Sequence, residues 1–335
     1  MQTWLDALFR KPSFLAGLAI ILFYVSVALV APIFYPGQLL TAMTLDPPMI
    51  AHCALPSPPT ITFSPFSLGP HPFGQTAFLG YGVAQGLIVG SRWDLYLLAM
   101  TVIGAAAIGI GIGLVSGTFG GRTDWAMMTV TDTVLSIPDF VFVLLVVAIV
   151  VPHIQSSYGP VVFVLAMVLV MWAPYARGVR GDALRVSSSM YVESAKASGA
   201  SQSRIMFRHV APNSMNAVLA QIPITVALSL ALIVAVQVVN AFANTTGGGI
   251  GPAACTYSMK IPAAPVVPVF NYPEWGGVLA AGLAYNGAWI PMPGQLLGTS
   301  WWGFLIPAVW ISVFGFGVVL VSDGVRDALS PRLRK

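Results

Sequence analysis

The sequence predicts an all-α integral membrane protein with six transmembrane helices and two proline-rich loops on its external side. Of its 335 residues, 57% are hydrophobic and only 8% are charged, whereas a soluble domain carries about 25% charged residues. Several apolar runs reach the roughly 20 residues that a membrane span requires. The 15 lysines and arginines fall almost entirely into alternate loops, as expected when basic loops stay in the cytoplasm.

Six apolar runs are predicted to span the membrane, and they cover residues 14–35, 93–117, 125–151, 160–176, 217–240 and 303–322. The first run is too long for the apolar region of a signal peptide, so we expect a retained anchor. With the N-terminus inside, only Arg92 and Lys260 among the basic residues face outward. We therefore expect the segments 1–13 and 323–335 in the cytoplasm and a core domain, 93–322, in the cell (inner or plasma) membrane.

The two external loops, residues 36–92 and 241–302, carry 16 of the 26 prolines. This composition predicts largely irregular structure, and loops of this length are usually functional or disordered. Their apolar content favours two ordered caps packed on each other. The only two cysteines, Cys53 and Cys255, lie one in each loop. Because disulfides persist outside the cytoplasm, we predict a Cys53–Cys255 bridge; two buried free thiols are the alternative.

A polar insert, residues 188–212, separates the fourth span from the fifth on the cytoplasmic side. The pattern predicts two short helices that meet at Gly199, which can adopt the positive φ of a sharp turn, and that end at Pro212. The serines before residue 190 and Ser201 are candidate N-caps for the two helices. Small side chains spaced by three on the first helix form a narrow face for close approach to a partner: Val192, Ala195 and Ser198.

This insert resembles the coupling loop, or EAA motif, of permease subunits of ATP-binding-cassette (ABC) importers. Glu193-Ser194-Ala195 stands where that family has Glu-Ala-Ala, and Gly199 and Pro212 follow at the family's spacing. Other blocks are similar to the dipeptide/oligopeptide/nickel permease family, and to the second subunit of dipeptide permeases in particular. They are HPFG at 71–74, YARGVRG at 175–181 and DGVRDAL at 323–329. The resemblance implies the type I ABC importer permease fold.

The resemblance also implies a non-catalytic subunit of an importer of di- or oligopeptides. Its expected partners are a homologous second permease in a heterodimer, two ABC ATPases, an extracytoplasmic solute-binding protein and membrane lipid. None of the four lysines is followed by Ser or Thr, as a phosphate-binding P-loop requires. We therefore expect no cofactor in this chain, with ATP and Mg²⁺ bound by the partner ATPases.

The coupling loop (residues 188–212) supplies the residues that the resemblance assigns to contact with the ATPase. They are Tyr191, Val192, Glu193, Ser194, Ala195, Lys196, Gly199, Ala200, Arg204, Arg208, His209 and Pro212. We expect Glu193 to form an ion pair with one of three basic residues of the loop: Lys196, Arg204 or Arg208. A solvated amphipathic loop without a partner is the alternative.

Ionisable residues inside membrane spans are candidates for the translocation path. Asp132 and Asp139 lie seven apart on the third span, hence on one helical face, and Pro138 is expected to kink the helix there. Asp132 has a second interpretation, a structural ion pair with an arginine near the coupling loop. Gln237 and Asn240 on the fifth span complete the candidate path.

Several alternatives stay open. The external loops depart from the family, and Gln237 replaces a glutamate, so an oligosaccharide or nickel importer is the second interpretation. A channel or secondary carrier is the more distant one, although the six spans show no evident repeat of the kind that carriers have. The four histidines are scattered and form neither a hydrolase motif nor a metal site. We expect no nucleic-acid partner, because the net charge of +4 reflects topology.

Overall fold

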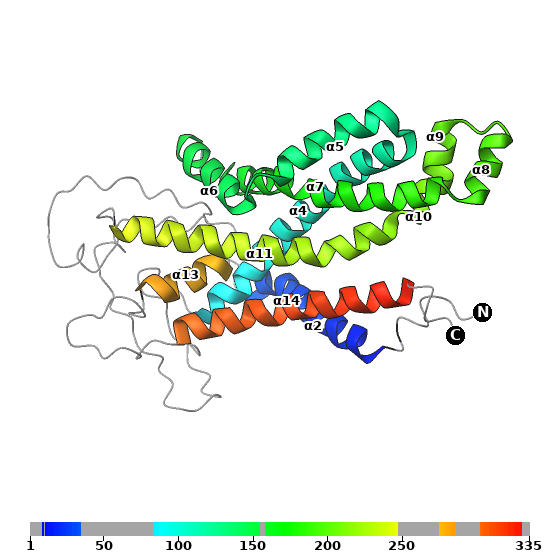
Figure 1. Ribbon diagram of the computed structural model, residues 1–335. Helices are drawn as coiled ribbons and strands as arrows, with labels where there is room; N and C mark the ends of the chain where they lie inside the picture. The colour runs from blue at the N-terminus through cyan, green and yellow to red at the C-terminus, as the bar shows by residue number, and fades with distance from the viewer. Residues whose placement is uncertain are drawn as a thin grey trace, which may run out of the picture.

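The computed structural model describes residues 9, 11–34, 83–154, 158–246, 275–285 and 302–329, which are overwhelmingly helical and include no strand. Five of these helices are long and apolar enough to cross a membrane: α2 (Pro12–Phe34), α4 (Val83–Phe119), α7 (Gly159–Ser187), α11 (Met215–Thr246) and α14 (Trp302–Leu329). Two shorter helices, α5 (Gly121–Leu135) and α6 (Asp139–Val150), meet at a bend of 74° and, taken together, are apolar enough to give a sixth candidate span. The predicted all-α fold is confirmed (Figure 1).

Helices also occupy parts of the predicted external loops. Helix α4 begins at Val83, not at residue 93, and α11 runs to Thr246. A further helix, α13 (Trp275–Tyr285), lies within the range 241–302. The expectation of irregular structure is therefore wrong for these segments. The predicted Cys53–Cys255 bridge lies outside the described residues, as does the packing of the two caps.

The third span is broken between α5 and α6 because of Pro138. Proline has no N–H to donate, and its ring disfavours helical geometry in the residue before it. Helix α5 therefore ends at Leu135, where Ser136 N–H donates to the carbonyls of Asp132 (3.1 Å) and Thr133 (3.2 Å). Pro138 is extended, with ψ 116°, and precedes α6. The predicted kink is confirmed as a full break. A short 3₁₀ turn, η1 (Val151–His153), follows α6.

Helices α4 and α7 pack at very close range through glycines on α4. A Cβ added at Gly109 would overlap Tyr175 Cβ, and one at Gly113 would lie 2.6 Å from the carbonyl oxygen of Ala176. One at Gly117 would lie 2.6 Å from Ala183 Cβ. Such a stripe of small residues lets two helix backbones approach where lipid offers no hydrophobic driving force. The α4–α7 pair is therefore rigidly interlocked.

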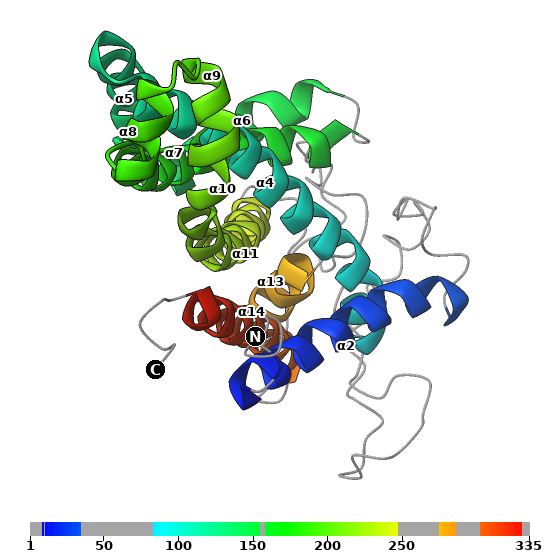
Figure 2. The ribbon, with the colours of Figure 1, turned by 90° about the vertical axis from the view of Figure 1, so that its right-hand side faces the viewer.

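Helices α2 and α14 form a second close pair. A Cβ added at Gly17 would lie 2.7 Å from the carbonyl oxygen of Gly317. Lys11 Nζ, before the first turn of α2, forms an ion pair with Asp327 Oδ2 at 2.7 Å near the end of α14. The start of α2 and the end of α14 thus lie at the same end of the bundle, as two termini on one side of the membrane require (Figures 1 and 2).

The coupling loop and α13 lie at opposite ends of the molecule (Figure 1). The loop contains α8 (Met190–Ala197), α9 (Gln202–Ile205), the π-helical turn η3 (Met206–Val210) and α10 (Ala211–Asn213). It projects beyond the ends of α7 and α11, at the end of the bundle where α14 also finishes. Helix α13 lies between α11 and α14 (Figure 2).

Candidate functional site: the coupling loop

A tight turn at Gly199 separates the two helical segments of the loop. Gly199 has φ 83°, a conformation that is costly for residues with a Cβ. Its N–H donates to the carbonyl of Lys196 (3.0 Å), and Ala200 N–H donates to that of Ala195 (3.1 Å). This pair of bonds is a Schellman motif, which closes the C-terminus of a helix. The predicted role of Gly199 is confirmed.

The second helical segment of the loop starts at Ser201, as predicted, but does not end at Pro212. Ser201 Oγ accepts a hydrogen bond from Arg204 N–H at 3.4 Å and so caps α9. The chain then widens into a π turn, in which Ala211 N–H donates to Met206 O. Pro212 lies inside α10, and the chain turns at Ser214 before α11. Pro212 therefore does not end the segment, because a proline in the first turn of a helix loses no hydrogen bond.

The inner face of the loop is anchored in the core. Val192, Ile205, Met206 and Val210 are buried and belong to the same apolar cluster as α4 and α7. The prediction that Val192, Ala195 and Ser198 form one face toward a partner is therefore wrong. Val192 is buried in this chain, whereas Ser198 is exposed. Because apolar anchors from both segments are buried in the bundle, the loop is held to it as a unit.

The outer face of the loop carries large exposed apolar side chains. Met190 is 83% exposed, Phe207 68% and Tyr191 48%. The Tyr191 ring lies beside that of His209, with centroids 6.2 Å apart. These side chains come from both segments at the tip of the bundle. Exposed aromatic and Met residues are enriched at protein–protein interfaces, so the outer face has the composition of a docking surface.

Charged residues surround this outer face. The side chains of Glu193, Lys196, Arg204 and Arg208 are exposed. Among the residues that the structure describes, Glu193 forms no ion pair, so the expected pairing within the loop is not found. The Glu193 carboxylate lies at the protein surface, where another subunit can reach it. Two further predicted residues have structural roles in the loop. Ser194 Oγ donates to Met190 O (2.9 Å) within α8, and half-buried Ala200 takes part in the turn at Gly199.

A partly buried ion pair joins α7, the helix that leads into the loop, to α5. Arg180 on α7 donates from Nε and Nη2 to the two carboxylate oxygens of Asp124 on α5, at 2.5 and 2.6 Å. Ser116 of α4 donates to the same carboxylate. This bidentate arrangement ties three helices together. The sequence analysis missed the pair, since both residues are charged but nothing in their spacing shows that α5 and α7 are neighbours.

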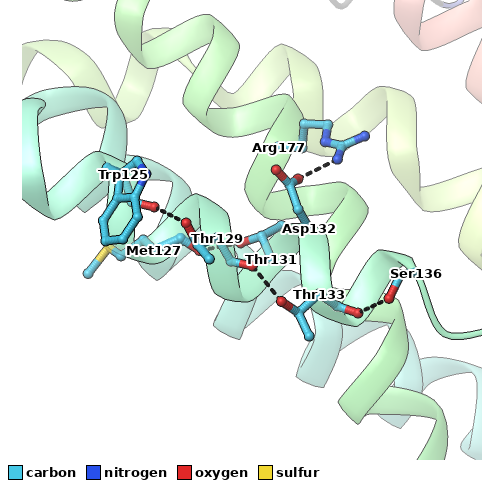
Figure 3. Close-up of polar contacts among 8 residues, drawn as sticks. All are labelled: Trp125, Met127, Thr129, Thr131, Asp132, Thr133, Ser136 and Arg177. Atoms are coloured by element: carbon cyan, nitrogen blue, oxygen red, sulfur yellow. Dashed lines mark hydrogen bonds and ion pairs between the residues drawn. The ribbon is translucent and has the colours of Figure 1, made fainter.

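The two aspartates predicted to line the path lie on different helices, Asp132 on α5 and Asp139 on α6. Asp132 Oδ1 lies 2.5 Å from Arg177 Nη2, the ion pair that the structural interpretation predicted (Figure 3). Asp139 is half-buried at the start of α6, on the far side of the 74° bend. The prediction that both aspartates share one helical face is therefore wrong. Gln237 is half-buried on α11, and the Asn240 side chain lies outside the described residues.

Within the described ranges, no group of three or more His, Cys, Asp or Glu residues could hold a metal ion.

Comparison with known proteins agrees with this arrangement. The family model of binding-protein-dependent transport system inner membrane components matches residues 109–335, from the glycine stripe of α4 onward. The oligopeptide transport system permease protein OppC of Bacillus subtilis is 29% identical over 100% of this chain and 92% of its own length. The dipeptide transport system permease protein DppC of the same organism is 27% identical over 96% of this chain and 82% of its own length.

A third relative is the probable D,D-dipeptide transport system permease protein DdpC of Escherichia coli, 28% identical over 78% of this chain and 74% of its own. The family match covers well over half of the chain and includes the entire coupling loop. The chain is a multi-pass, non-catalytic membrane subunit, and it belongs to the family of binding-protein-dependent transport system inner membrane components.

Proposed function

We propose that this chain is one of two permease subunits of an ATP-driven importer that moves di- or oligopeptides into the cytoplasm. The coupling loop is the observation on which the proposal mainly rests. Its inner face is anchored in the bundle, whereas its outer face exposes Met190, Tyr191 and Phe207. A soluble ATPase that docks on such a face can push the membrane helices without distorting the loop itself.

The force would pass from the loop into the paired helices α4 and α7. Only Ser188 and Ser189 separate the last residue of α7 from α8, so a displacement of the loop is transmitted directly to α7. The glycine contacts of α4 with α7 and the Asp124–Arg180 pair leave little room for these helices to slide. A closely packed core changes between discrete arrangements and does not deform continuously.

The complete importer would contain a homologous second permease, two ABC ATPases that bind ATP and Mg²⁺, and an extracytoplasmic solute-binding protein. Both termini and the coupling loop would lie in the cytoplasm. The ion pair between Lys11 and Asp327 supports a common side for the two termini. The distribution of basic residues supports a cytoplasmic coupling loop.

The solute class follows from the relatives that are named oligopeptide and dipeptide permeases and from a polar face on α5. Thr129, Asp132 and Thr133 of α5 and Ser136 at its C-cap recur at i, i+3, i+4 and i+7 and are exposed in this chain (Figure 3). The hydroxyl groups donate within the helix, so their oxygens are free to accept. Together with the Arg177 guanidinium, this face offers one positive charge, the negative charge of Asp132 and hydroxyl groups that can accept hydrogen bonds. A zwitterionic peptide would need such partners.

Cysteine accessibility tests whether that face lines the aqueous path. In a background lacking Cys53 and Cys255, Thr133→Cys should react with a water-soluble thiol reagent in the assembled importer. Val130→Cys is the matched control, because Val130 is also exposed on α5 but lies to one side of the polar face. We expect Val130→Cys to be protected by lipid. Equal protection of both cysteines would contradict a path on this face.

Serine substitutions at Met190, Tyr191 and Phe207 test the importer itself, because these side chains are exposed, whereas Val192 and Ile205 of the same loop are buried in the core. The triple substitution should abolish ATP-dependent uptake and co-purification of the ATPases, whereas the flux of a channel or carrier would survive it. Mass spectrometry of ligands retained by the cognate binding protein tests the solute. Peptides are expected there; oligosaccharides or nickel would replace the peptide assignment while leaving the importer role intact.

A further inference from the structure

The described helix α13 is shorter than a membrane span, and its first half is largely buried. Its 11 residues span about 16 Å, roughly half of the hydrocarbon thickness. Trp275, Val278, Leu279 and Ala280 are buried in it, and it packs against α4, α11 and α14. It lies at the end of the bundle opposite the coupling loop (Figure 1). A part-length buried helix in this place is a candidate for the element that opens and closes the external end.

A carboxylate on α4 holds the first residue of α13. Asp94 is completely buried, and its Oδ2 accepts a hydrogen bond from the Trp275 N–H at 2.7 Å. The first N–H groups of a helix lack partners within the helix and form its positive end. Asp94 therefore caps α13 from 181 positions away in the chain. Burying a carboxyl group is costly unless it is hydrogen-bonded, and the N–H at the start of α13 supplies one such hydrogen bond to Asp94.

The indole of Trp275 strengthens the same contact. Its Nε1–H donates to the carbonyl of Leu87 (3.0 Å) and to Ser91 Oγ (3.2 Å), both on α4. The ring also packs edge-on against Tyr24 of α2 and Phe314 of α14, with centroids 5.5 and 5.3 Å away. One residue of α13 therefore joins α4 to the α2–α14 pair.

Helix α4 connects this contact to the coupling loop. Of the described helices that are long enough to span a membrane alone, α4 is the only one without an internal proline. Asp94 and Gly117 lie about 35 Å apart along it, at about 1.5 Å per residue. At Gly117 the helix is packed against α7, and at Asp94 it is bonded to α13. A movement of α7 thus reaches α13 through one uninterrupted helix.

We propose that Asp94 is a positioning residue that fastens α13 to the outer end of α4, so that α13 follows the movement that the coupling loop imparts. Ser91 assists by holding the Trp275 indole. The proposal rests on the importer function proposed above. It assigns the α4–α13 contact a role in coupling ATP hydrolysis to the opening of the external end.

The test compares three variants in the assembled importer, reconstituted with its partner permease, ATPases and binding protein. Asp94→Asn keeps an oxygen acceptor of the same size, whereas Asp94→Leu removes the acceptor. Ser312→Ala is the control, because Ser312 is exposed on α14 and bonds only a carbonyl of its own helix. Two quantities are measured: hydrogen exchange in the peptide covering Trp275–Tyr285, and uptake of labelled dialanine per ATP hydrolysed.

In Asp94→Leu, we expect faster hydrogen exchange over Trp275–Tyr285 and a loss of at least about tenfold in uptake per ATP. This is the loss expected when the buried Trp275 N–H is left without its acceptor. Asp94→Asn and Ser312→Ala should stay within about twofold of wild type. Normal coupling in Asp94→Leu would overturn the proposal. So would a parallel fall of uptake and ATP hydrolysis with their ratio unchanged, because that pattern indicates only a folding role.

A second variant keeps the test decisive if Asp94→Leu does not assemble. Trp275→Phe keeps the aromatic packing but removes the indole donor to Leu87 and Ser91. A reduced uptake-to-ATP ratio in Trp275→Phe supports the fastening role, and an unchanged ratio refutes it. If the wild-type importer itself takes up no dialanine, the proposed solute fails, whereas the exchange measurement still decides whether Asp94 holds α13.

Discussion

Replacing Gly113 by alanine should destabilise the bundle although it adds only one methyl group. The new Cβ would lie 2.6 Å from the carbonyl oxygen of Ala176, 2.8 Å from Val179 Cβ and 3.0 Å from the backbone nitrogen of Arg180. Ordinary van der Waals contact begins at 3.4 Å, so the closest contact is short by 0.8 Å (3.4 − 2.6). Two of the three neighbours are backbone atoms, which cannot rotate away. Overpacking of this kind costs about 1–3 kcal/mol.

Gly111 provides the matched control. It lies on the same helix, and a Cβ added there meets nothing within 4 Å. Gly111→Ala should be neutral or stabilise the helix by up to about 1 kcal/mol, since alanine favours helix over glycine. Equilibrium unfolding in mixed micelles measures both variants. If Gly113→Ala is as stable as Gly111→Ala, then α4 and α7 are not interlocked as described, and the transmission of force between them loses its basis.

Three further predictions concern the coupling loop and its supports. Gly199→Ala should weaken ATPase co-purification, because a positive φ costs a residue with a Cβ about 1–2 kcal/mol; Gly181→Ala, at an unconstrained helical glycine, should not. Arg180→Ala should lower the unfolding free energy by about 1–3 kcal/mol, since it leaves a partly buried carboxylate unpaired. Arg177→Ala, at an exposed pair, should cost less than about 1 kcal/mol, and equal losses would contradict this assignment. Phe207→Ser should reduce ATPase-coupled uptake without lowering thermal stability, because its side chain is exposed; a stability loss would show that Phe207 is a core residue.

Hydrophobic runs and local turn chemistry predicted much of this fold. The spans were located because an apolar segment of sufficient length has few alternatives to crossing the membrane. Gly199, Ser201 and Pro138 were interpreted correctly because their effects act within a few residues of themselves. Helix α13 was missed because 11 residues are fewer than a span requires, and proline-rich flanks mask a short helix.

Most partners of the charged residues could not be predicted from sequence; an arginine partner for Asp132 was the exception. Asp94, Asp124 and Asp132 all find donors far away in the chain, at Trp275, Arg180 and Arg177. Which helices are neighbours, and at what rotation, is decided by glycine contacts and aromatic packing that no local pattern reports. The expected ion pair of Glu193 within the loop did not form, although Lys196 lies three residues further along the same helix. Sequence spacing alone does not fix an exposed ion pair.

Site-specific photo-crosslinking from the coupling loop tests the central claim most directly. A photoreactive amino acid placed at Phe207, the exposed aromatic of the loop's outer face, should crosslink to the ATPase subunit in the assembled importer. The same label at Phe304, exposed near the start of α14 at the opposite end of the bundle, should not. Crosslinks from Phe207 only to lipid, or to a protein on the external side of the membrane, would contradict the account.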